Sequence, residues 1–513
     1  MMIANRQARG QVVATWLAAQ AHSSPEAVAI EYLDEAITYG HLHHRAVELA
    51  DKLSGLGLDR GSRIGTIADN DADQVILFFA CAICGFILVP LNWRLTGTEL
   101  TTQLNVVAPA LVAASDTHID LARSAVDASA FPSPVGYLRD LVEAPTGVYG
   151  RGHTSEACVA GDEDPLLIIF TSGSTGRPKG AVLTNANCVW TNMSLDRVVP
   201  LSSNDVVLQV LPQCHVSGWN VQPLQAWLKG ATVIIEPRFD PGRTLSLIET
   251  RRVTTMMGVP TIFRMLAEDP AFETADLTSL RRVVVGGATM PRDLLHIWRQ
   301  RDVDIHQGYG LTEAGPNVLC LTAKDATAHP ASVGRPYPFV DVELHEPDTG
   351  LLIAGAGTGE LWVSGPNVFA GYWKDNGATT CAMTGRWLRT GDLAKRDDQG
   401  FYRICGRLAE CFRSGGEDVY PADVEMVLRD HKDVRDAAVV GVRDPRWGEI
   451  GVAFIEPKTG HTLSEEQLIA YCRNQLAGFK VPRRITIVSQ LPRLVSGKLD
   501  KHRLADMAER AHV

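Results

Sequence analysis

Apolar and polar residues alternate along the first part of the chain in the rhythm of helices and strands. Residues 41–58 (HLHHRAVELADKLSGLGL) repeat apolar positions with helical spacing and stop at glycines, whereas residues 110–115 (ALVAAS) form a short apolar run. Further apolar runs that end at turn residues lie at 166–170, 206–212, 232–237, 254–260 and 281–288. Strands that alternate with helices predict an α/β architecture with largely parallel sheets.

The pattern changes twice further along. From about residue 332, short β runs with Gly, Pro and Asn turns predict a β region that closes the large domain. Beyond residue 407, a new series of helices and strands carries enough apolar residues for a core of its own. A chain of 513 residues is also too long for one core. We therefore predict a large N-terminal domain, 1–408, of mixed or parallel sheets flanked by helices, and a small mobile α+β domain, 409–513.

Composition narrows the class of protein. Apolar content of 45% and charged content of 21% are typical of a soluble globular protein, and the net charge of −10 argues against nucleic-acid and anionic-membrane surfaces. The apolar stretch Gln74–Leu91 contains Gly85 and Pro90, which favour a buried helix followed by a strand over a membrane span. Most of the ten cysteines, including Cys81 and Cys84 in this apolar stretch, stand among apolar neighbours and are expected to be buried thiols, so we expect a cytoplasmic protein.

The stretch 171–180, TSGSTGRPKG, has the composition of a polyphosphate-binding loop. Its glycines allow backbone N–H groups to approach phosphate oxygens, its hydroxyls add donors, and Lys179 adds a positive charge. The Walker pattern is excluded because Gly180, rather than Ser or Thr, follows Lys179. The predicted phosphate-binding residues are Thr171, Ser172, Gly173, Ser174, Thr175, Gly176 and Lys179.

Further motifs follow in a fixed order. They are LPQCHVSG at 211–218, GGA at 286–288, QGYGLTE at 307–313, RTGD at 389–392, GRLAE at 406–410 and LPRLVSGKLDK at 491–501. Together with the 171–180 loop, this series resembles the acyl-adenylate-forming superfamily of acyl-CoA synthetases, luciferases and peptide-synthetase adenylation domains. The resemblance covers nearly the whole chain.

The resemblance implies a nucleotide site for ATP and Mg²⁺. Tyr309 is expected to stack on adenine, Thr312 to contact phosphate and Asp392 to accept from the ribose hydroxyls. Thr175 and Glu313 are the expected Mg²⁺ residues, since this ion prefers oxygen ligands. The expected catalytic residues are Lys498, His215, Thr175 and Glu313. The remaining expected nucleotide contacts are Gly287, Ala288, Gln307, Gly308, Arg407 and Lys498.

The same resemblance places the acid and the acyl acceptor. The expected acid pocket consists of His215, Ser217, Trp219, Asn220, Gly286, Gly308, Pro316 and Asn317. Trp219, Asn220 and Asn317 favour a small aromatic or short functionalised acid over a long fatty acid. The expected acceptor region is Ser414, Gly415, Gly416 and Glu417, where CoA enters; Trp447–Glu449 also resembles stand-alone CoA ligases.

The implied activity is ATP-dependent adenylation of an acid with loss of pyrophosphate, followed by transfer to CoA. Two departures from the family pattern keep an alternative acceptor open: Ala409 replaces Asp or Lys at the hinge, and Cys214 replaces an aromatic residue. The alternative is an amine ligase, or an enzyme that activates nitrite for attack by an arylamine. A catalytically idle nucleotide-binding scaffold is disfavoured by Lys498, Glu313 and Asp392. Family habit suggests a homodimer.

Overall fold

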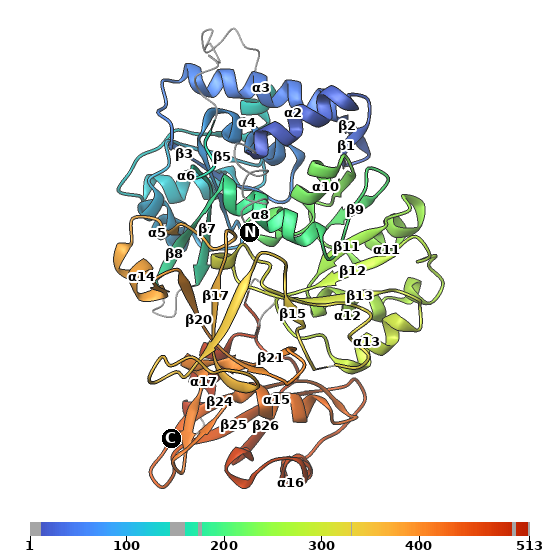
Figure 1. Cartoon of the computed structure of the whole chain (residues 1–513), viewed down its shortest axis with the longest axis vertical. Helices are drawn as coiled ribbons and strands as arrows, with labels where there is room; N and C mark the ends of the chain where they lie inside the picture. Colours follow the sequence, from blue (N-terminus) through green and yellow to red (C-terminus); the bar gives the residue numbers. More distant parts are fainter. Residues whose placement is uncertain (1–11, 144–159, 173–176, 330, 495–498, 511–513) are drawn as a thin grey trace.

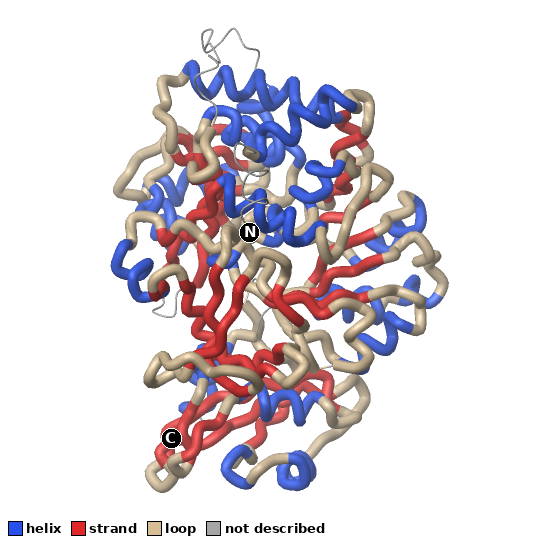
Figure 2. Tube along the Cα trace, in the orientation of Figure 1, coloured by secondary structure: helices blue, strands red, loops and turns tan. Residues whose placement is uncertain are grey.

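The computed structural model describes residues 12–143, 160–172, 177–329, 331–494 and 499–510 (Figure 1). Three sheets with their helices form the large upper part of Figure 1, and a fourth sheet forms the small lower part, coloured orange to red. In Figure 2, helices gather at the top and the right of the large part, around strands that run through its middle. The predicted α/β fold class is confirmed.

The first sheet has seven strands in the order β18-β8-β7-β4-β3-β5-β6. It is parallel from β7 to β6, whereas β8 is antiparallel to both β7 and β18. Its strands are β3 (Arg63–Ile67), β4 (Ile87–Leu91), β5 (Leu111–Ala114), β6 (Val135–Tyr137), β7 (Pro165–Ser172), β8 (Pro178–Thr184) and β18 (Gly371–Tyr372). The helices between them are α4 (Ala72–Cys84), α5 (Gly97–Val107), α6 (Ile119–Asp127), α7 (Leu138–Glu143) and α8 (Asn185–Asp196).

The long apolar stretch folds as predicted, into helix α4 followed by strand β4. Asp71 caps the start of α4 by accepting from the backbone N–H of Asp73, and Gly85 ends it with a left-handed φ of 70°. The stretch is therefore divided between two core elements. Across the described residues, the longest apolar helices fall short of what a membrane crossing requires.

The second sheet has nine strands in the order β15-β14-β13-β12-β11-β9-β10-β1-β2. Its strands are β1 (Val28–Tyr32), β2 (Glu35–Thr38), β9 (Val206–Gln209), β10 (Thr232–Ile235), β11 (Thr255–Gly258), β12 (Arg282–Val285), β13 (Ile305–Tyr309), β14 (Leu319–Leu321) and β15 (Arg335–Pro336). The section from β1 through β13 is parallel. Associated helices are α9 (Ser217–Asn220), α10 (Pro223–Lys229), α11 (Pro241–Thr250), α12 (Pro260–Glu268) and α13 (Arg292–Arg299).

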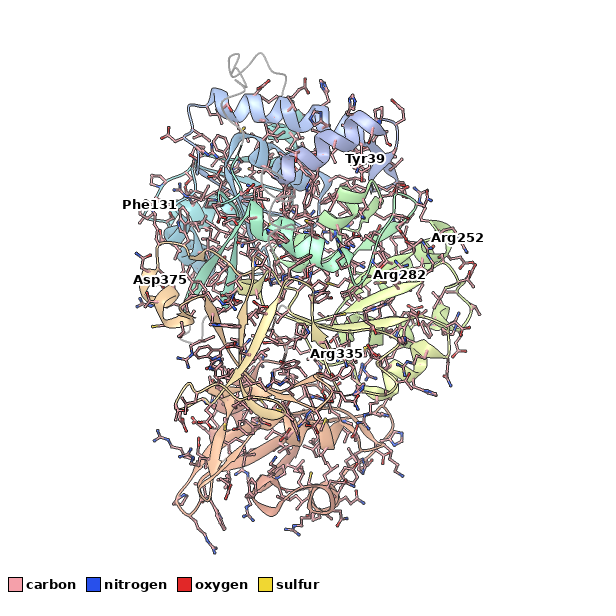
Figure 3. All side chains as sticks on the ribbon, in the orientation of Figure 1. Tyr39, Phe131, Arg252, Arg282, Arg335 and Asp375 are labelled. Carbon is pink, nitrogen blue, oxygen red and sulfur yellow. The ribbon has the colours of Figure 1, made fainter. Side chains whose placement is uncertain are left out.

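The N-terminal helices α2 (Val13–Ser23) and α3 (Tyr39–Gly55) pack beside this sheet. Tyr39 is fully buried, and its hydroxyl donates to the carbonyl oxygen of Ala231 at 2.7 Å (Figure 3). A buried phenol needs such a partner, so this contact fixes α3 against the start of β10.

The predicted β region is an antiparallel sheet of five strands, called here the five-stranded sheet, that closes the large part. It comprises β16 (Asp341–His345), β17 (Gly357–Ser364), β19 (Met383–Thr384), β20 (Trp387–Arg396) and β21 (Tyr402–Arg407). Leu361, Val363 and Ala394 of this sheet share one hydrophobic core with Leu167 of β7. The helix α14 (Asn376–Ala382) lies beside it.

The C-terminal part has its own core, as its pattern predicted. Its strands are β22 (Phe412–Ser414), β23 (Glu417–Val419), β24 (Val434–Asp444), β25 (Gly448–Pro457) and β26 (Arg484–Ile487), and its helices are α15 (Pro421–Arg429), α16 (Glu465–Gln475) and α17 (Lys501–Arg510). Phe412, Val424 and Ile455 belong to a cluster made only of residues from this part. Arg435 forms an ion pair of 3.0 Å with Glu268 of the large part. The boundary at 408/409 stays a prediction.

Candidate active site

The predicted phosphate loop lies at the tip of a β-hairpin in the seven-stranded sheet. Thr171 and Ser172 end β7, and Lys179 lies on β8 opposite Thr171. The tip residues Gly173, Ser174, Thr175 and Gly176 lie outside the described residues. A Cβ at Gly180 would come within 2.7 Å of Cγ2 of Ile168, so the second arm requires glycine there. The stretch predicted as a loop is therefore held at both ends by the sheet.

A carboxylate from the nine-stranded sheet meets this hairpin. Glu313 follows β13 in the short 3-10 helix η3 (Thr312–Ala314), and its Oε1 accepts from the hydroxyl of Thr171 at 3.2 Å. The same oxygen accepts from the hydroxyl of Tyr372 at 2.9 Å, and Nζ of Lys179 lies 5.2 Å from the centre of the Tyr372 ring. Burial and the charge of Glu313 raise the pKa of Tyr372. Three predicted residues thus come together around a tyrosine that the motifs did not indicate.

A second carboxylate lies where the nine-stranded and five-stranded sheets meet. Asp392 is buried; its Oδ2 accepts from the hydroxyl of Tyr309 at 2.5 Å, and its Oδ1 pairs with Nε of Arg407 at 3.0 Å. The charge of Asp392 raises the pKa of Arg407, and burial followed by that charge raises the pKa of Tyr309. The motif RTGD lies within β20, where Gly391 has a φ of 68°.

The glycine positions flank the ends of β12 and β13. Gly286 is buried, whereas Gly287 and Ala288 are exposed and Gly287 has a left-handed φ of 80°. Gly308 is half-buried on β13. The side chain of Gln307, a predicted nucleotide-binding residue, forms hydrogen bonds within the protein. Its buried amide accepts from the N–H of Met290 at 2.8 Å and donates to the carbonyl oxygen of Ser332 at 2.9 Å, so it connects two loops of the protein.

The residues predicted to line the acid pocket differ in how deeply they are buried. His215 and Ser217 are half-buried at the turn between β9 and α9, and Pro316 is half-buried after η3. Trp219 is fully buried; it stacks on Phe78 with ring centres 4.9 Å apart. Because Trp219 has no solvent-accessible surface, it does not line a pocket, and the prediction for this residue is wrong.

Three other residues near the turn, Asn220, Asn317 and Cys214, are buried. Asn220 is fully buried and donates to the carbonyl oxygen of Gly315 at 2.7 Å, so it supports the segment that carries Pro316 and Asn317. Asn317 is 7% exposed. Burial raises the pKa of Cys214 to about 12, so this thiol stays protonated and takes no nucleophilic role.

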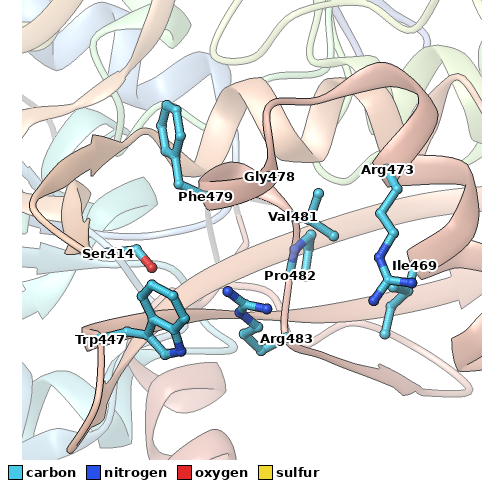
Figure 4. Close-up of a pocket in the computed structure, with 10 residues that line it drawn as sticks. Ser414, Trp447, Ile469, Arg473, Gly478, Phe479, Val481, Pro482 and Arg483 are labelled. Carbon is cyan, nitrogen blue, oxygen red and sulfur yellow. The ribbon is translucent and has the colours of Figure 1, made fainter.

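The expected acceptor region borders a cavity in the C-terminal part (Figure 4). Ser414, Gly415, Gly416 and Glu417 form the turn between β22 and β23. The cavity measures about 570 Å³, and its lining includes Ser414, Gly415, Trp447, Phe479, Arg473 and Arg483. The guanidinium carbon of Arg483 lies 4.9 Å from the centre of the Trp447 ring. Two cations and two aromatic rings therefore surround a space next to the predicted acceptor turn.

The sequence matches the AMP-binding enzyme family over residues 17–373, and the C-terminal domain of AMP-binding enzymes over residues 423–498. The chain belongs to the AMP-binding enzyme family. Its predicted place in the acyl-adenylate-forming superfamily, among the AMP-forming acid–CoA ligases, is confirmed.

Two curated relatives of this AMP-binding enzyme match almost end to end. A feruloyl-CoA synthase from Amycolatopsis sp is 36% identical, with 96% of this chain and 98% of the relative covered. An indoleacetate–CoA ligase from Aromatoleum aromaticum is 34% identical, with 96% and 98% covered. Among solved structures, the o-succinylbenzoate coenzyme A synthetase from Bacillus subtilis, in complex with ATP and magnesium ion, superimposes with a TM-score of 0.85 at 26% identity, covering 95% and 98%.

The predicted catalytic lysine of this AMP-binding enzyme, Lys498, lies outside the described residues. Its described neighbours Arg493 and Leu499 pair as an isolated β-bridge. Lys501, three residues after Lys498, donates to Glu410 at 2.7 Å and pairs with Glu425 at 2.9 Å. Glu410 belongs to the predicted hinge motif, so the lysine segment is connected to the hinge.

Proposed function

We propose that this protein activates a small aromatic or short functionalised acid with ATP and transfers the acyl group to CoA. A carboxylate oxygen of the acid attacks the α-phosphorus of ATP, and the bond to pyrophosphate breaks. The CoA thiol then attacks the acyl carbon, AMP leaves, and the thiol proton passes to solvent. The observation that carries the proposal is the pair of carboxylates, Glu313 and Asp392, each held by hydroxyl groups or a cation beside the predicted nucleotide residues.

Asp392 is suited to holding ribose. Tyr309 donates to one of its oxygens and Arg407 pairs with the other, so the carboxylate is held in one orientation, and each carboxylate oxygen can accept more than one hydrogen bond. Thr171, Ser172 and Lys179 on the hairpin arms, with the tip residues, would hold the phosphates.

Glu313 and Thr175 would hold Mg²⁺. The carboxylate of Glu313 is half-buried and accepts two hydroxyl hydrogen bonds, so it is an oriented, hard oxygen ligand of the kind this ion prefers. Mg²⁺ supplies positive charge to the phosphate oxygens when it is bound. Lys498 would stabilise the charge that develops on the α-phosphate, and His215 would contact the reacting carboxylate.

The cavity beside the predicted acceptor turn favours CoA over a bare amine. CoA carries phosphates and an adenine ring, and Arg473, Arg483, Trp447 and Phe479 offer cations and aromatic faces to such groups. A small amine has no use for a cavity of about 570 Å³ with this lining. The names of the two curated relatives, which are both CoA-thioester-forming ligases of aromatic acids, support the same acid class and acceptor.

The test measures pyrophosphate release from ATP with a panel of aromatic, short-chain and long-chain acids and with nitrite. Each acid is assayed with CoA, with an arylamine and with neither. We expect pyrophosphate release with an aromatic or short functionalised acid, and a thioester product only with CoA. Absence of release with every acid would refute adenylation. Turnover that requires the arylamine and does not change when CoA is added would show that the protein is an amine ligase, which is the alternative function.

A further inference from the structure

Methionine 257 lies on the face of the nine-stranded sheet that carries the predicted acid pocket. Met257 of β11 pairs in register with Val284 of β12, so it lies on the same face as Gly286, which is two residues after Val284 and directly follows β12. Val284 pairs with His306 of β13, which places Gly308 on that face too. The neighbouring Met256 points to the opposite face, where it is fully buried in a cluster with Val283 and Val285.

The segment that carries His215 and Ser217 covers the same face. Gln209 follows Leu208, which pairs with Met256, so Gln209 and Met257 project to the same side. The amide nitrogen of Gln209 donates to the carbonyl oxygen of Gly218 at 3.0 Å. The α9 turn is therefore attached to the same face of the sheet that carries Met257.

The end of the Met257 side chain rests on Gly286. A Cβ added at Gly286 would lie 2.9 Å from Cε of Met257 and 3.9 Å from the carbonyl oxygen of Gly308. The side chain of Met257 is half-buried, unlike that of Met256, so it borders accessible space. Because residue 286 is a glycine, the space where its side chain would lie is open, and the flexible thioether of Met257 occupies part of that space.

We propose that Met257 is a specificity-determining residue, which limits the length of the aryl acid that reaches the adenylation site. This inference rests on the proposed acid-activating function. Beyond its Cβ, methionine contributes three heavy atoms, which is about the reach of the extra atoms that distinguish an arylpropenoic acid from a benzoic acid. Because methionine has several rotatable bonds, it limits length without the fixed shape of an aromatic wall.

The experiment measures kcat/KM for pyrophosphate release with benzoate, phenylacetate, cinnamate and ferulate. We expect Met257→Ala to raise the ratio of the ferulate to the benzoate value at least about tenfold, since one methylene in an apolar pocket changes selectivity about 10- to 200-fold. Gly286→Ala should lower turnover of the longer acids, because its Cβ meets the Met257 methyl. The double variant should recover it, because the colliding methyl is gone.

Met256→Ala is the matched control, with the same side chain removed from the adjacent position on the opposite face. It should lower the melting temperature and leave the ratio unchanged. Met257→Val, a milder truncation, replaces the alanine variant if that variant unfolds. A folded Met257 variant with a ratio within twofold of wild type, or a double variant no better than Gly286→Ala, would overturn the inference. Wild type that releases no pyrophosphate with any acid would instead overturn the proposed function, and this inference with it.

Discussion

Tyr372 is the residue whose replacement tests the phosphate end of the site most directly. Its hydroxyl donates to Oε1 of Glu313 at 2.9 Å, and its ring lies 5.2 Å from Nζ of Lys179. Tyr372→Phe removes the hydrogen bond and keeps the ring, so the cation–π contact with Lys179 survives. The substitution therefore isolates the support that Tyr372 gives to the carboxylate.

The magnitude follows from the charge of the acceptor. A hydrogen bond to a charged group contributes about 1.5–3 kcal/mol, against about 1 kcal/mol for a neutral pair. Thr171 still donates to the same oxygen, but at the longer distance of 3.2 Å. If the lost bond holds Glu313 in the geometry that ATP requires, then kcat/KM for ATP should fall about 10- to 100-fold, at 1.4 kcal/mol for each factor of ten. In the ATP-free variant, water can donate to the half-buried carboxylate in place of the lost hydroxyl. The free energy of unfolding of the protein should therefore change by less than about 1 kcal/mol.

The assay is acid-dependent pyrophosphate release at varied ATP, with urea melts and ATP binding by calorimetry on the same preparations. Tyr402→Phe is the matched control, because that hydroxyl contacts Arg396 at 3.3 Å within the five-stranded sheet and its loss should leave ATP kinetics unchanged. Kinetics of Tyr372→Phe within twofold of wild type would refute the role of this hydroxyl. A large fall in the free energy of unfolding, with unchanged kinetics in the folded fraction, would show that the Tyr372 hydroxyl has a structural role only.

Three further predictions concern other parts of the chain. Burial, followed by the charge of Asp71, raises the pKa of Asp73 from 3.8 to about 7, so the folded chain holds a proton that the unfolded chain releases between about pH 4 and 7. The free energy of unfolding should therefore decline as pH rises through this window, and urea melts should show a shallower decline for Asp73→Asn. Trp219→Ala should cost about 3–5 kcal/mol in urea melts without a selective change in acid preference; an intact melt with a new preference would restore Trp219 to the pocket. Glu410→Gln removes the negative charge that pairs with Lys501 and should alter thioester formation by about 1.4- to 5-fold in single-turnover assays, with pyrophosphate release unchanged; equal effects on both would contradict a hinge role.

The sequence predicted the elements well because their signals are local. Helix α4 follows an apolar run that Gly85 interrupts, and strands β9 to β12 follow short apolar runs that end at turn residues. The separate C-terminal core was likewise visible as a second series of helix and strand patterns. In each case the residues that decide the structure are neighbours along the chain.

The sequence was less reliable for side chains whose role depends on distant partners. Tyr372 sits on a two-residue strand, and only the pairing of β18 with β8 brings it beside Glu313. The motif containing Trp219 suggested a pocket, yet stacking on Phe78, far away in sequence, places this ring in the core. Gln307 stands inside a strong motif, but its amide serves the loops at Met290 and Ser332. Tertiary contact decided these cases, and no local pattern reports it.

The two carboxylates also connect the sheets of the large part. Glu313, from the segment after β13, is held by hydroxyls of the seven-stranded sheet, whereas Asp392 of the five-stranded sheet is held by Tyr309 of the nine-stranded sheet. Each contact therefore fixes the position of one sheet against another at the place where the nucleotide is proposed to bind. The affinity for a nucleotide that contacts both carboxylates would depend on the distances between the three sheets. A packing change far from the site should therefore alter ATP affinity. Catalytic and stability measurements on the same variants are needed to separate lost chemistry from displaced sheets.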